Sequence, residues 1–470
     1  MSYMVGRQHQ IELLDRLVRS PKAEFLALYG RRRVGKTYLV REYFDYKFDF
    51  QISGLARGST AQQLDHFHNA FEEYSKDRYA HPPKNWLEAF NRLKKTLSKT
   101  KTGKKKIVFF DEMPWMDTLK SDFVMALESF WNSWASNRKD ILVLASGSSA
   151  SWILSKLINN NGGLHNRITM PIKLNPLTLN EVEEFLKIKD CQLDRYQIAE
   201  LYMALGGIPY YFDFVQPGMS VAQIIDSLFF SDQATLNNEF TNLYKSLFKK
   251  YTWHEKIVET LSLKSKGFTR NEIVKLSGLA SGGTMTKTLK ELEQCDFIST
   301  HKDFDSNSKN VRYRLSDFYT AFYFKFIKNT KYTGKGTWTK LIDNPVHRAW
   351  QGYTFEQLCM SHISQIKTAR GIQGILSDEF AWQNESTQID LVIDRRDHVI
   401  NIFEMKFSLN RFAITKDYHE KLRNKIAHFK EGTKTRKSVF LTFVTTYGLE
   451  KNKYYGIVQN EIKLDALFAP

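Results

Sequence analysis

Residues 25–37 read FLALYGRRRVGKT, and this stretch decides the fold of the N-terminal part of the chain. The apolar run at 25–29 predicts a buried strand, and the next eight residues fit the pattern G-x-x-x-x-G-K-[ST] without a mismatch. A helix-like stretch follows at 36–44. The glycines let backbone N–H groups close around phosphate oxygens beside the positive end of a helix. The stretch therefore predicts a strand, a phosphate-binding loop and a helix in succession.

The ligand expected in this loop is ATP with Mg²⁺. The ammonium of Lys36 would reach the β- and γ-phosphates and act in catalysis, and the hydroxyl of Thr37 would coordinate the metal. The residues expected to bind the nucleotide are Gly30, Arg31, Arg32, Arg33, Val34, Gly35, Lys36, Thr37 and Tyr38.

An acidic pair follows a second apolar run. Ile107–Phe110 precedes Asp111 and Glu112. A buried strand would deliver Asp111 to the metal at the C-terminal edge of the sheet. Glu112 would orient and polarise the attacking water as a catalytic residue. By itself such a pair fits a solvated turn equally well, and the upstream loop favours the catalytic interpretation.

Two further catalytic candidates follow the apolar run Ile141–Ala145. Ser148 lies just after this run and could sense the γ-phosphate, although serines after strands are also common turn formers. Arg167 could supply a cation to the charge of the transition state, and an ordinary exposed arginine is an equal alternative.

The N-terminal third alternates short apolar runs with helical segments, which predicts an α/β fold with a parallel sheet covered on both faces. The expected strands are 25–29, 48–52, 107–110 and 141–145, with a long helical region at 60–98. This region ends in a basic turn, which is either a solvated loop or a contact for a phosphate backbone. Its lysines are Lys94, Lys95, Lys99, Lys101, Lys104, Lys105 and Lys106.

Together these motifs resemble the predominantly archaeal ATPase family, an AAA-like and STAND-related branch of P-loop ATPases. The resemblance covers about residues 2–240. It rests on Arg31–Thr37, FFDE at 109–112, GSSASW at 147–152 and GGIPYY at 206–211, with Val5-Gly6-Arg7 and Glu12 resembling the start of the family near adenine. It implies Mg²⁺-dependent ATP hydrolysis. Sites of this class are often completed by an arginine of a neighbour, so self-association through the ATPase domain is a further expectation.

Composition sets the limits on the class of protein. The chain has 470 residues, which predicts two to four domains, and its 42% hydrophobic and 25% charged residues are typical of globular proteins. Three cysteines exclude a disulfide framework and favour the cytoplasm. Neither a signal peptide nor an apolar run long enough to span a membrane is expected. The net charge of +17 makes DNA an expected partner, with a merely basic soluble protein as the alternative.

Four segments are expected along the chain. An ATPase core at 1–174 is followed by a helical lid at 175–250, a winged-helix domain at 251–330 and a nuclease-like α/β domain at 346–470. Three short helices and a β-hairpin at 303–309 give the winged-helix order, a variant of the helix-turn-helix. Such modules bind DNA or only proteins. The recognition helix would present Thr284, Thr286, Lys287 and Lys290.

A second set of candidate residues lies near the C-terminus. Asp390 on one expected strand is followed by Glu404-x-Lys406 on the next. Residues two apart on a strand share a face, so a hairpin would bring these side chains together. Asp390, Glu404 and Glu356 of the preceding helix would hold a divalent cation, and Lys406 would act in catalysis beside it. A hairpin with exposed charges is the alternative.

This second pattern resembles the PD-(D/E)xK nuclease fold, with Ile389 where the pattern has proline. The core order helix–strand–strand–helix–strand agrees, and a basic stretch follows at 416–437. The fold can be retained without cleavage. Two functions therefore remain open: an ATPase that couples its nucleotide state to DNA binding or metal-dependent DNA cleavage, and a signalling-type ATPase switch whose C-terminal domains only bind DNA or a protein.

Overall fold

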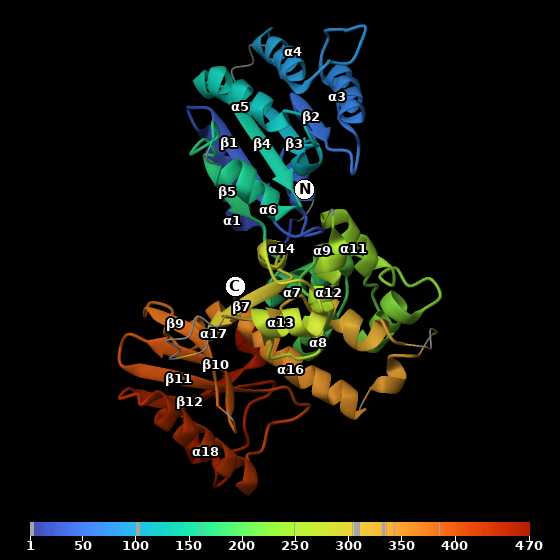
Figure 1. The fold of residues 1–470 in the computed structure, drawn as a ribbon. Coiled ribbons are helices and arrows are strands. Elements are labelled where there is room, and N and C mark those ends of the chain that lie inside the picture. The colour runs from blue at the N-terminus through green and yellow to red at the C-terminus, as the bar shows by residue number, and fades with distance from the viewer. Residues whose placement is uncertain are drawn as a thin grey trace. The chain divides into compact units, whose positions relative to one another are not determined.

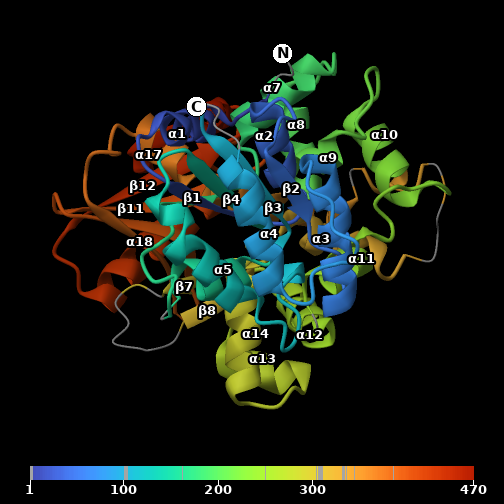
Figure 2. The same ribbon diagram turned by 90° about the horizontal axis from the view of Figure 1, so that it is seen from above.

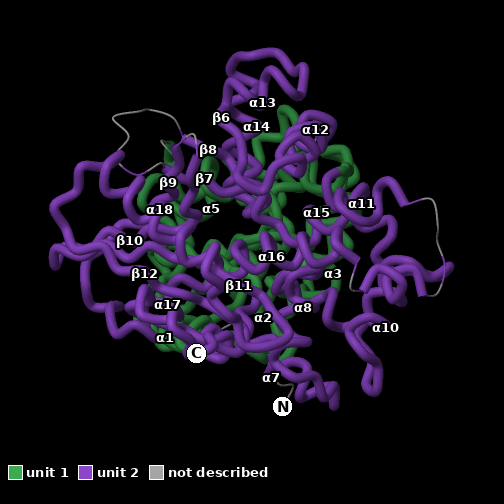
Figure 3. Tube along the Cα trace, turned by 90° about the horizontal axis from the view of Figure 1, so that it is seen from below, with its two compact units in different colours: residues 1–176, 245–249 green, residues 177–244, 250–470 purple. Residues whose placement is uncertain are grey.

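The structure is a computed structural model, and the chain divides into two compact units (Figures 1 and 3). Unit 1 comprises residues 1–176 with 245–249, and unit 2 comprises residues 177–244 with 250–470. The structure describes residues 4–99, 104–160, 162–248, 250–302, 304, 311–330, 334, 336–342, 344–384 and 386–470.

Unit 1 is built on a parallel five-stranded sheet of order β2-β3-β4-β1-β5. Its strands are β1 (Glu24–Tyr29), β2 (Phe50–Ser53), β3 (Lys106–Asp111), β4 (Ile141–Gly147) and β5 (Met170–Lys173). The four expected strands are confirmed. The sequence did not predict β5, since it has only four residues and contains Pro171, which suits an edge strand rather than an apolar run.

Helices cover both faces of this sheet. They are α1 (Gln8–Arg19), α2 (Lys36–Tyr43), α3 (Thr60–Tyr74), α4 (Trp86–Lys99), α5 (Phe123–Ser133) and the short α6 (Ala150–Trp152), which continues into η3 (Ile153–Ile158). Figure 2 shows α4 and α5 across β3 and β4. The buried side chains Phe25, Val108 and Val143 pack with Phe90 and Phe130 in this layer. The alternate strand residues are buried as well, as expected of a sheet covered on both faces.

The helical region expected at 60–98 is present and consists of two helices, α3 and α4. Ser59 caps α3 in a capping box with Gln62, and the helix ends at Tyr74. Pro82 and Pro83 lie between α3 and α4. Neither proline can donate a backbone hydrogen bond, so a continuous helix is excluded there.

The first part of unit 2 is mostly helical. Its elements are α7 (Leu179–Ile188), α8 (Arg195–Leu205), α9 (Pro209–Phe212), α10 (Val221–Ile225), η4 (Asp226–Phe230), α11 (Glu239–Leu247), α12 (Tyr251–Ser262), α13 (Arg270–Ser277), α14 (Gly283–Gln294), α15 (Phe318–Phe322), η5 (Tyr323–Ile327) and η6 (Thr339–Leu341). A three-stranded antiparallel sheet of order β6-β8-β7 accompanies α12–α14. β6 (Phe268–Thr269) lies between α12 and α13, and β7 (Ile298–Lys302) and β8 (Val311–Leu315) follow α14. The hairpin turn expected at 303–309 lies outside the described residues except for Phe304.

The C-terminal part of unit 2 contains a mixed sheet of order β13-β12-β11-β10-β9. Its strands are β9 (Ser377–Gln383), β10 (Gln388–Arg395), β11 (Val399–Lys406), β12 (Ser438–Thr445) and β13 (Asn460–Lys463). The helices are α16 (Pro345–Ser361), α17 (Ile363–Ala369) and α18 (Lys416–Thr433), with the short η7 (Tyr455–Ile457) and η8 (Leu464–Phe468). The expected helix–strand–strand–helix–strand order is present, and the sequence missed only the two edge strands.

Contacts distant in sequence tie the helices of unit 2 to its C-terminal part. The N–H of Leu179, the first residue of α7, donates to Nε2 of His362 over 3.1 Å. Nδ1 of this buried ring lies 2.9 Å from the carbonyl oxygen of Leu358, so Nδ1 carries the proton. Burial lowers the pKa of His362, which favours the neutral ring that this cap needs. Arg195 of α8 pairs with Asp465 at 2.9 Å.

Candidate functional site

The phosphate-binding loop connects β1 to α2. Gly30 has φ 148°, and a Cβ there would lie 2.3 Å from the carbonyl oxygen of Leu174, so no larger residue fits. Gly35 caps α2 in the left-handed region at φ 91°. Arg7 donates to the carbonyl of Val34 over 3.0 Å and so holds the loop to the start of the chain.

Lys36 is buried in the centre of this loop. Its ammonium donates to the carbonyl oxygens of Gly30 at 3.0 Å and Arg31 at 2.9 Å. It also donates to the hydroxyl of Ser148 over 3.2 Å. These contacts hold the ammonium inside the loop.

Asp111 lies beside the loop, at the carboxyl end of β3. The hydroxyl of Thr37 donates to its two carboxylate oxygens over 2.9 and 3.0 Å. The two residues expected to hold Mg²⁺ are thus in direct contact, and their hydroxyl and carboxylate oxygens suit this hard cation. Ser53 also donates to Asp111, over 3.1 Å, and so does Ser146. The sequence did not predict a role for these two serines. Each lies at or near the end of an expected strand, and this position could have identified them as neighbours of Asp111.

Glu112 lies directly after β3 and turns towards β4. Its backbone has φ 47°, a left-handed conformation that costs a non-glycine residue about 1 kcal/mol or more. Ser148 binds both of its carboxylate oxygens, through its N–H at 3.0 Å and through its hydroxyl. Ser148 therefore bridges Lys36 and Glu112, as its expected place between the two halves of the site requires.

The other nucleotide-binding candidates differ in exposure. Arg31 and Val34 are buried, Arg32 and Arg33 are half-buried, and Tyr38 is 48% exposed. Val34 contributes its backbone to the loop, since its side chain is fully buried in packing.

Arg167 does not lie with these residues. Met170, the first residue of β5, pairs with Leu26, and the N–H of Thr169 donates to the carbonyl of Phe25. Arg167 is therefore beyond the amino end of β1, whereas the phosphate loop follows its carboxyl end. A six-residue strand is about 20 Å long, so Arg167 does not reach the loop of its own chain.

Residues 4–215 match a protein family described as an ATPase domain predominantly from Archaea. The chain carries an archaeal-type P-loop ATPase domain. This ATPase domain includes the loop, Asp111, Glu112 and Ser148, and it extends through α9 of unit 2.

Full-length relatives are distant. An uncharacterized protein of Methanocaldococcus jannaschii is 24% identical over 394 residues, which cover 83% of this chain and 83% of that protein. An uncharacterized ATP-binding protein of the same organism is 44% identical over 43 residues, covering 9% of this chain and 73% of that protein. Among solved structures, a Walker-type ATPase of Pyrococcus abyssi covers 69% of this chain and 96% of its own, at 15% identity and a TM-score of 0.49. Within the described ranges, none of the helices has the length and apolar character needed to cross a bilayer.

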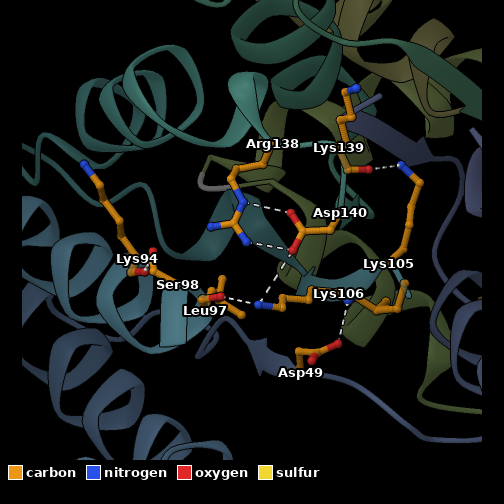
Figure 4. Close-up of polar contacts among 10 residues, drawn as sticks. Asp49, Lys94, Leu97, Ser98, Lys105, Lys106, Arg138, Lys139 and Asp140 are labelled. Atoms are coloured by element: carbon orange, nitrogen blue, oxygen red, sulfur yellow. Dashed lines mark hydrogen bonds and ion pairs between the residues drawn. The ribbon is translucent and has the colours of Figure 1, made fainter. Parts of the chain in front are cut away.

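The basic turn of the ATPase domain has a structural use (Figure 4). The side chain of Lys106 is fully buried, donates to the carbonyl of Leu97 and lies 3.7 Å from Asp140, which Arg138 also binds. Lys105 donates to the carbonyl of Lys139 over 3.3 Å. Lys99 pairs with Asp77 at 2.6 Å. These contacts bind Lys99, Lys105 and Lys106 to other parts of the protein, and Lys106 is the buried first residue of β3 rather than part of a solvated turn. Lys101 lies outside the described residues.

The C-terminal candidates surround Glu404 of β11. Oε1 of Glu404 pairs with Lys406 at 2.7 Å and accepts from the hydroxyl of Tyr418, and Oε2 pairs with Lys425 at 2.6 Å. Burial alone would raise the pKa of Glu404, but the charges of the two lysines lower it to about 2. Burial, reinforced by Asp390, raises the pKa of Glu356 well above its usual range. We call Glu356, Asp390, Glu404, Lys406, Tyr418 and Lys425 the Glu404 cluster.

The expected metal ligands are neighbours here. The register of β10 and β11, with Val392 opposite Ile402, places Asp390 opposite Glu404 when it is continued by two residues. Within the described parts of the chain, no group of three or more His, Cys, Asp or Glu side chains is placed to hold a metal ion. Because two ammonium groups and the Tyr418 hydroxyl already bind the oxygens of Glu404, the donor set around Glu404 does not fit a divalent cation.

Sequence reasoning missed Tyr418 and Lys425. Both lie on α18 with the buried residues Leu422 and Phe429, at the spacings 418, 422, 425 and 429. This helical spacing puts Lys425 on the buried face, and it was the signal that could have separated it from the exposed lysines of the same helix.

The residues expected on a recognition helix share one face of α14. Thr284, Thr286, Lys287 and Lys290 are all exposed, whereas Met285, Thr288 and Leu289 are buried. The helix thus presents two lysines and two hydroxyl groups to solvent.

Proposed function

We propose that the chain is a Mg²⁺-dependent ATPase whose nucleotide state controls its binding to DNA. The observation that carries the proposal is the Lys36–Ser148–Glu112 chain of hydrogen bonds beside the contact between Thr37 and Asp111. It supplies a cation for the phosphates, two ligands for a metal and a carboxylate for the attacking water, all next to the glycine loop.

Each side chain has one task in this reaction. Lys36 neutralises the γ-phosphoryl oxygens as negative charge shifts onto them. Glu112 orients the water that attacks phosphorus and accepts its proton. Thr37 and Asp111 would hold Mg²⁺, which would neutralise phosphate charge. The products are ADP and inorganic phosphate.

Ser148 couples nucleotide binding to the position of Glu112. Its hydroxyl accepts from Lys36 and donates to Glu112. Phosphate oxygens compete with Ser148 for Lys36, so occupation of the loop rearranges the same hydroxyl that holds Glu112. The loop after β4 therefore responds to the γ-phosphate, which is what a nucleotide-controlled switch requires.

The DNA-binding part of the proposal rests on residues 251–330. The order α12, α13, α14 followed by β7 and β8 fits a winged helix, with α14 as recognition helix. The exposed lysines Lys287 and Lys290 suit contacts to phosphate, and the net charge of +17 favours a polyanionic partner. We propose a cytoplasmic location, which suits a chain with only three cysteines.

Self-association is part of the proposal because of Arg167. Arg167 is exposed and lies at the opposite end of β1 from the loop. An arginine at that edge can contribute to hydrolysis only at the loop of another copy, so an Arg167 role requires assembly of at least two chains.

Within unit 2 we propose a nuclease-like domain at 346–470 that binds rather than cleaves. Both oxygens of Glu404 already pair with ammonium groups. This observation favours the switch over metal-dependent cleavage by Asp390, Glu404 and Lys406.

The test measures ATP turnover and DNA affinity on the full-length chain. Phosphate release is followed with Mg²⁺, and binding of labelled double-stranded DNA is followed by fluorescence anisotropy with ATP, with ADP and without nucleotide. We expect Lys36→Ala to lose turnover and to make DNA affinity independent of ATP.

A matched control is Lys47→Ala, because Lys47 is an exposed lysine of unit 1 that pairs with Asp45. It should keep both properties. Equal DNA affinity in all nucleotide states of the unmodified chain would refute the coupling, and undiminished turnover in Lys36→Ala would refute the ATPase site.

A further inference from the structure

The Glu404 cluster contains an ammonium group that the D…ExK pattern does not include. Lys425 comes from α18, 21 positions after Glu404, and its side chain is 22% exposed. Neighbouring cations on the same helix, Lys421 and Arg423, are exposed to solvent. Lys425 is thus turned into the cluster rather than towards a solvated face.

The hydrogen bonds that Glu404 already accepts determine where a cation could bind it. A carboxylate oxygen accepts about two hydrogen bonds. Oε1 already serves Lys406 and Tyr418. A cation could therefore enter only at Oε2, where the Lys425 ammonium lies at 2.6 Å. A divalent cation beside this ammonium would be repelled, because two like charges at contact distance in a buried place interact strongly.

The strand register brings a second carboxylate close to Glu404. Val392 of β10 pairs with Ile402 of β11, and the same register continued by two residues places Asp390 opposite Glu404. Asp390 also accepts from Gln388, its neighbour on β10. Two carboxylates therefore lie near each other, and Lys425 supplies a positive charge beside Glu404.

We propose that the Lys425 ammonium takes the place of a divalent cation at Glu404 and excludes metal from the cluster. Tyr418 binds the same carboxylate from about two turns earlier on α18, and the Lys406 ammonium lies 5.4 Å from the centre of the Tyr418 ring. Lys425 and Tyr418 together join α18 to β11. The cluster is an internal ion-pair network that positions α18, and Lys425 is the residue that prevents a divalent cation from binding.

The test is Mn²⁺ binding by full-length protein without nucleotide, measured from the loss of the electron paramagnetic resonance signal of free Mn²⁺. Every sample carries Asp111→Asn, which removes the metal ligand of the ATPase site and makes the outcome independent of the proposed function. We expect no Asp390-dependent Mn²⁺ binding in this parent. Adding Lys425→Met should create one site per chain, with affinity raised about tenfold or more, because a buried carboxylate loses its partner. Adding Asp390→Asn should abolish that site again.

Lys421→Met is the matched control, since it removes an exposed lysine from the same helix and should leave Mn²⁺ binding unchanged. If Lys425→Met does not fold, Lys425→Gln repeats the test with a donor for Glu404 retained and only the charge removed. Mn²⁺ binding in the parent that disappears with Asp390→Asn would overturn the proposal. So would a natively folded Lys425 variant that gains no site.

Discussion

The ATPase site and the Glu404 cluster use the same residue types to opposite effect. In both, a lysine and carboxylates meet at strand ends. Lys36 is bound by two carbonyl oxygens and a hydroxyl, and Asp111 accepts from hydroxyl groups. In the cluster, Glu404 pairs directly with Lys406 and Lys425. The hydroxyl groups of Thr37 and Ser146 that bind Asp111 carry no charge, whereas the ion pairs at Glu404 cancel charge within the protein. The environment of the charges, rather than the motif, separates the two places.

The largest expected difference is between the two motif lysines. Lys36→Ala should lower ATP turnover by about a hundredfold or more, because the γ-phosphoryl charge loses its cation. Lys406→Ala should leave turnover within about twofold, since no step of hydrolysis uses it. Phosphate release from both variants under saturating ATP measures this. Equal losses in the two would abolish the distinction between the sites.

The second expected effect concerns the carboxylate that handles water. Glu112→Gln should retain ATP binding and lose about a hundredfold or more in kcat, because glutamine cannot accept the proton. Binding is read with a fluorescent ATP analogue and kcat by phosphate release. Asp117→Asn, a nearby acidic residue that accepts from the Trp152 ring N–H, serves as control. Full turnover in Glu112→Gln would show that another group activates the attacking water.

Ser148→Ala should have a smaller effect, of about tenfold in kcat, because one hydroxyl that links Lys36 and Glu112 is lost while its N–H contact to Glu112 stays. A change in KM alone would indicate a binding role instead. Ser149→Ala is the matched control on the same loop.

The pH dependence of stability tests the ion pairs of the Glu404 cluster. The pKa of Glu404 is lowered to about 2 from 4.5 in the unfolded chain, so its stabilisation is full above pH 4.5 and is lost as pH falls towards 2. The lowered pKa of Glu404 corresponds to about 3 kcal/mol of folding free energy. Hydrogen exchange of the β11 amides should therefore speed up on acidification in the unmodified protein more than in Glu404→Gln. Parallel profiles would show that the ion pairs contribute no stability.

Much of the ATPase domain could be predicted from the sequence because its signals are local. Gly30–Thr37 is contiguous, and Asp111 and Glu112 directly follow an apolar strand. The place of Arg167 in the fold could not be predicted, since no local pattern tells which edge of a sheet a residue before an unrecognised strand occupies. β5, the strand concerned, has four residues and a proline.

The Glu404 cluster was predictable in membership but not in chemistry. The spacing of Asp390, Glu404 and Lys406 correctly brought three residues near one another. Which groups bind Glu404 depends on the face of α18 that packs against β11, and the spacing of Asp390, Glu404 and Lys406 does not show this. Lys425 was hidden among other lysines of α18, and only its helical spacing distinguishes it.

The cap on α7 bears on the order in which the chain can fold during synthesis. The sheet of unit 1 is complete once Lys173 has left the ribosome. The acceptor for the N–H of Leu179 is made 183 residues later, and Asp465, which joins Glu183 as a partner of Arg195, is made 270 residues after Arg195. The helices that follow the ATPase sheet therefore wait, incompletely bonded, until nearly the whole polypeptide exists. Chains that stop early would retain the first sheet while exposing these helices to chaperones and proteases.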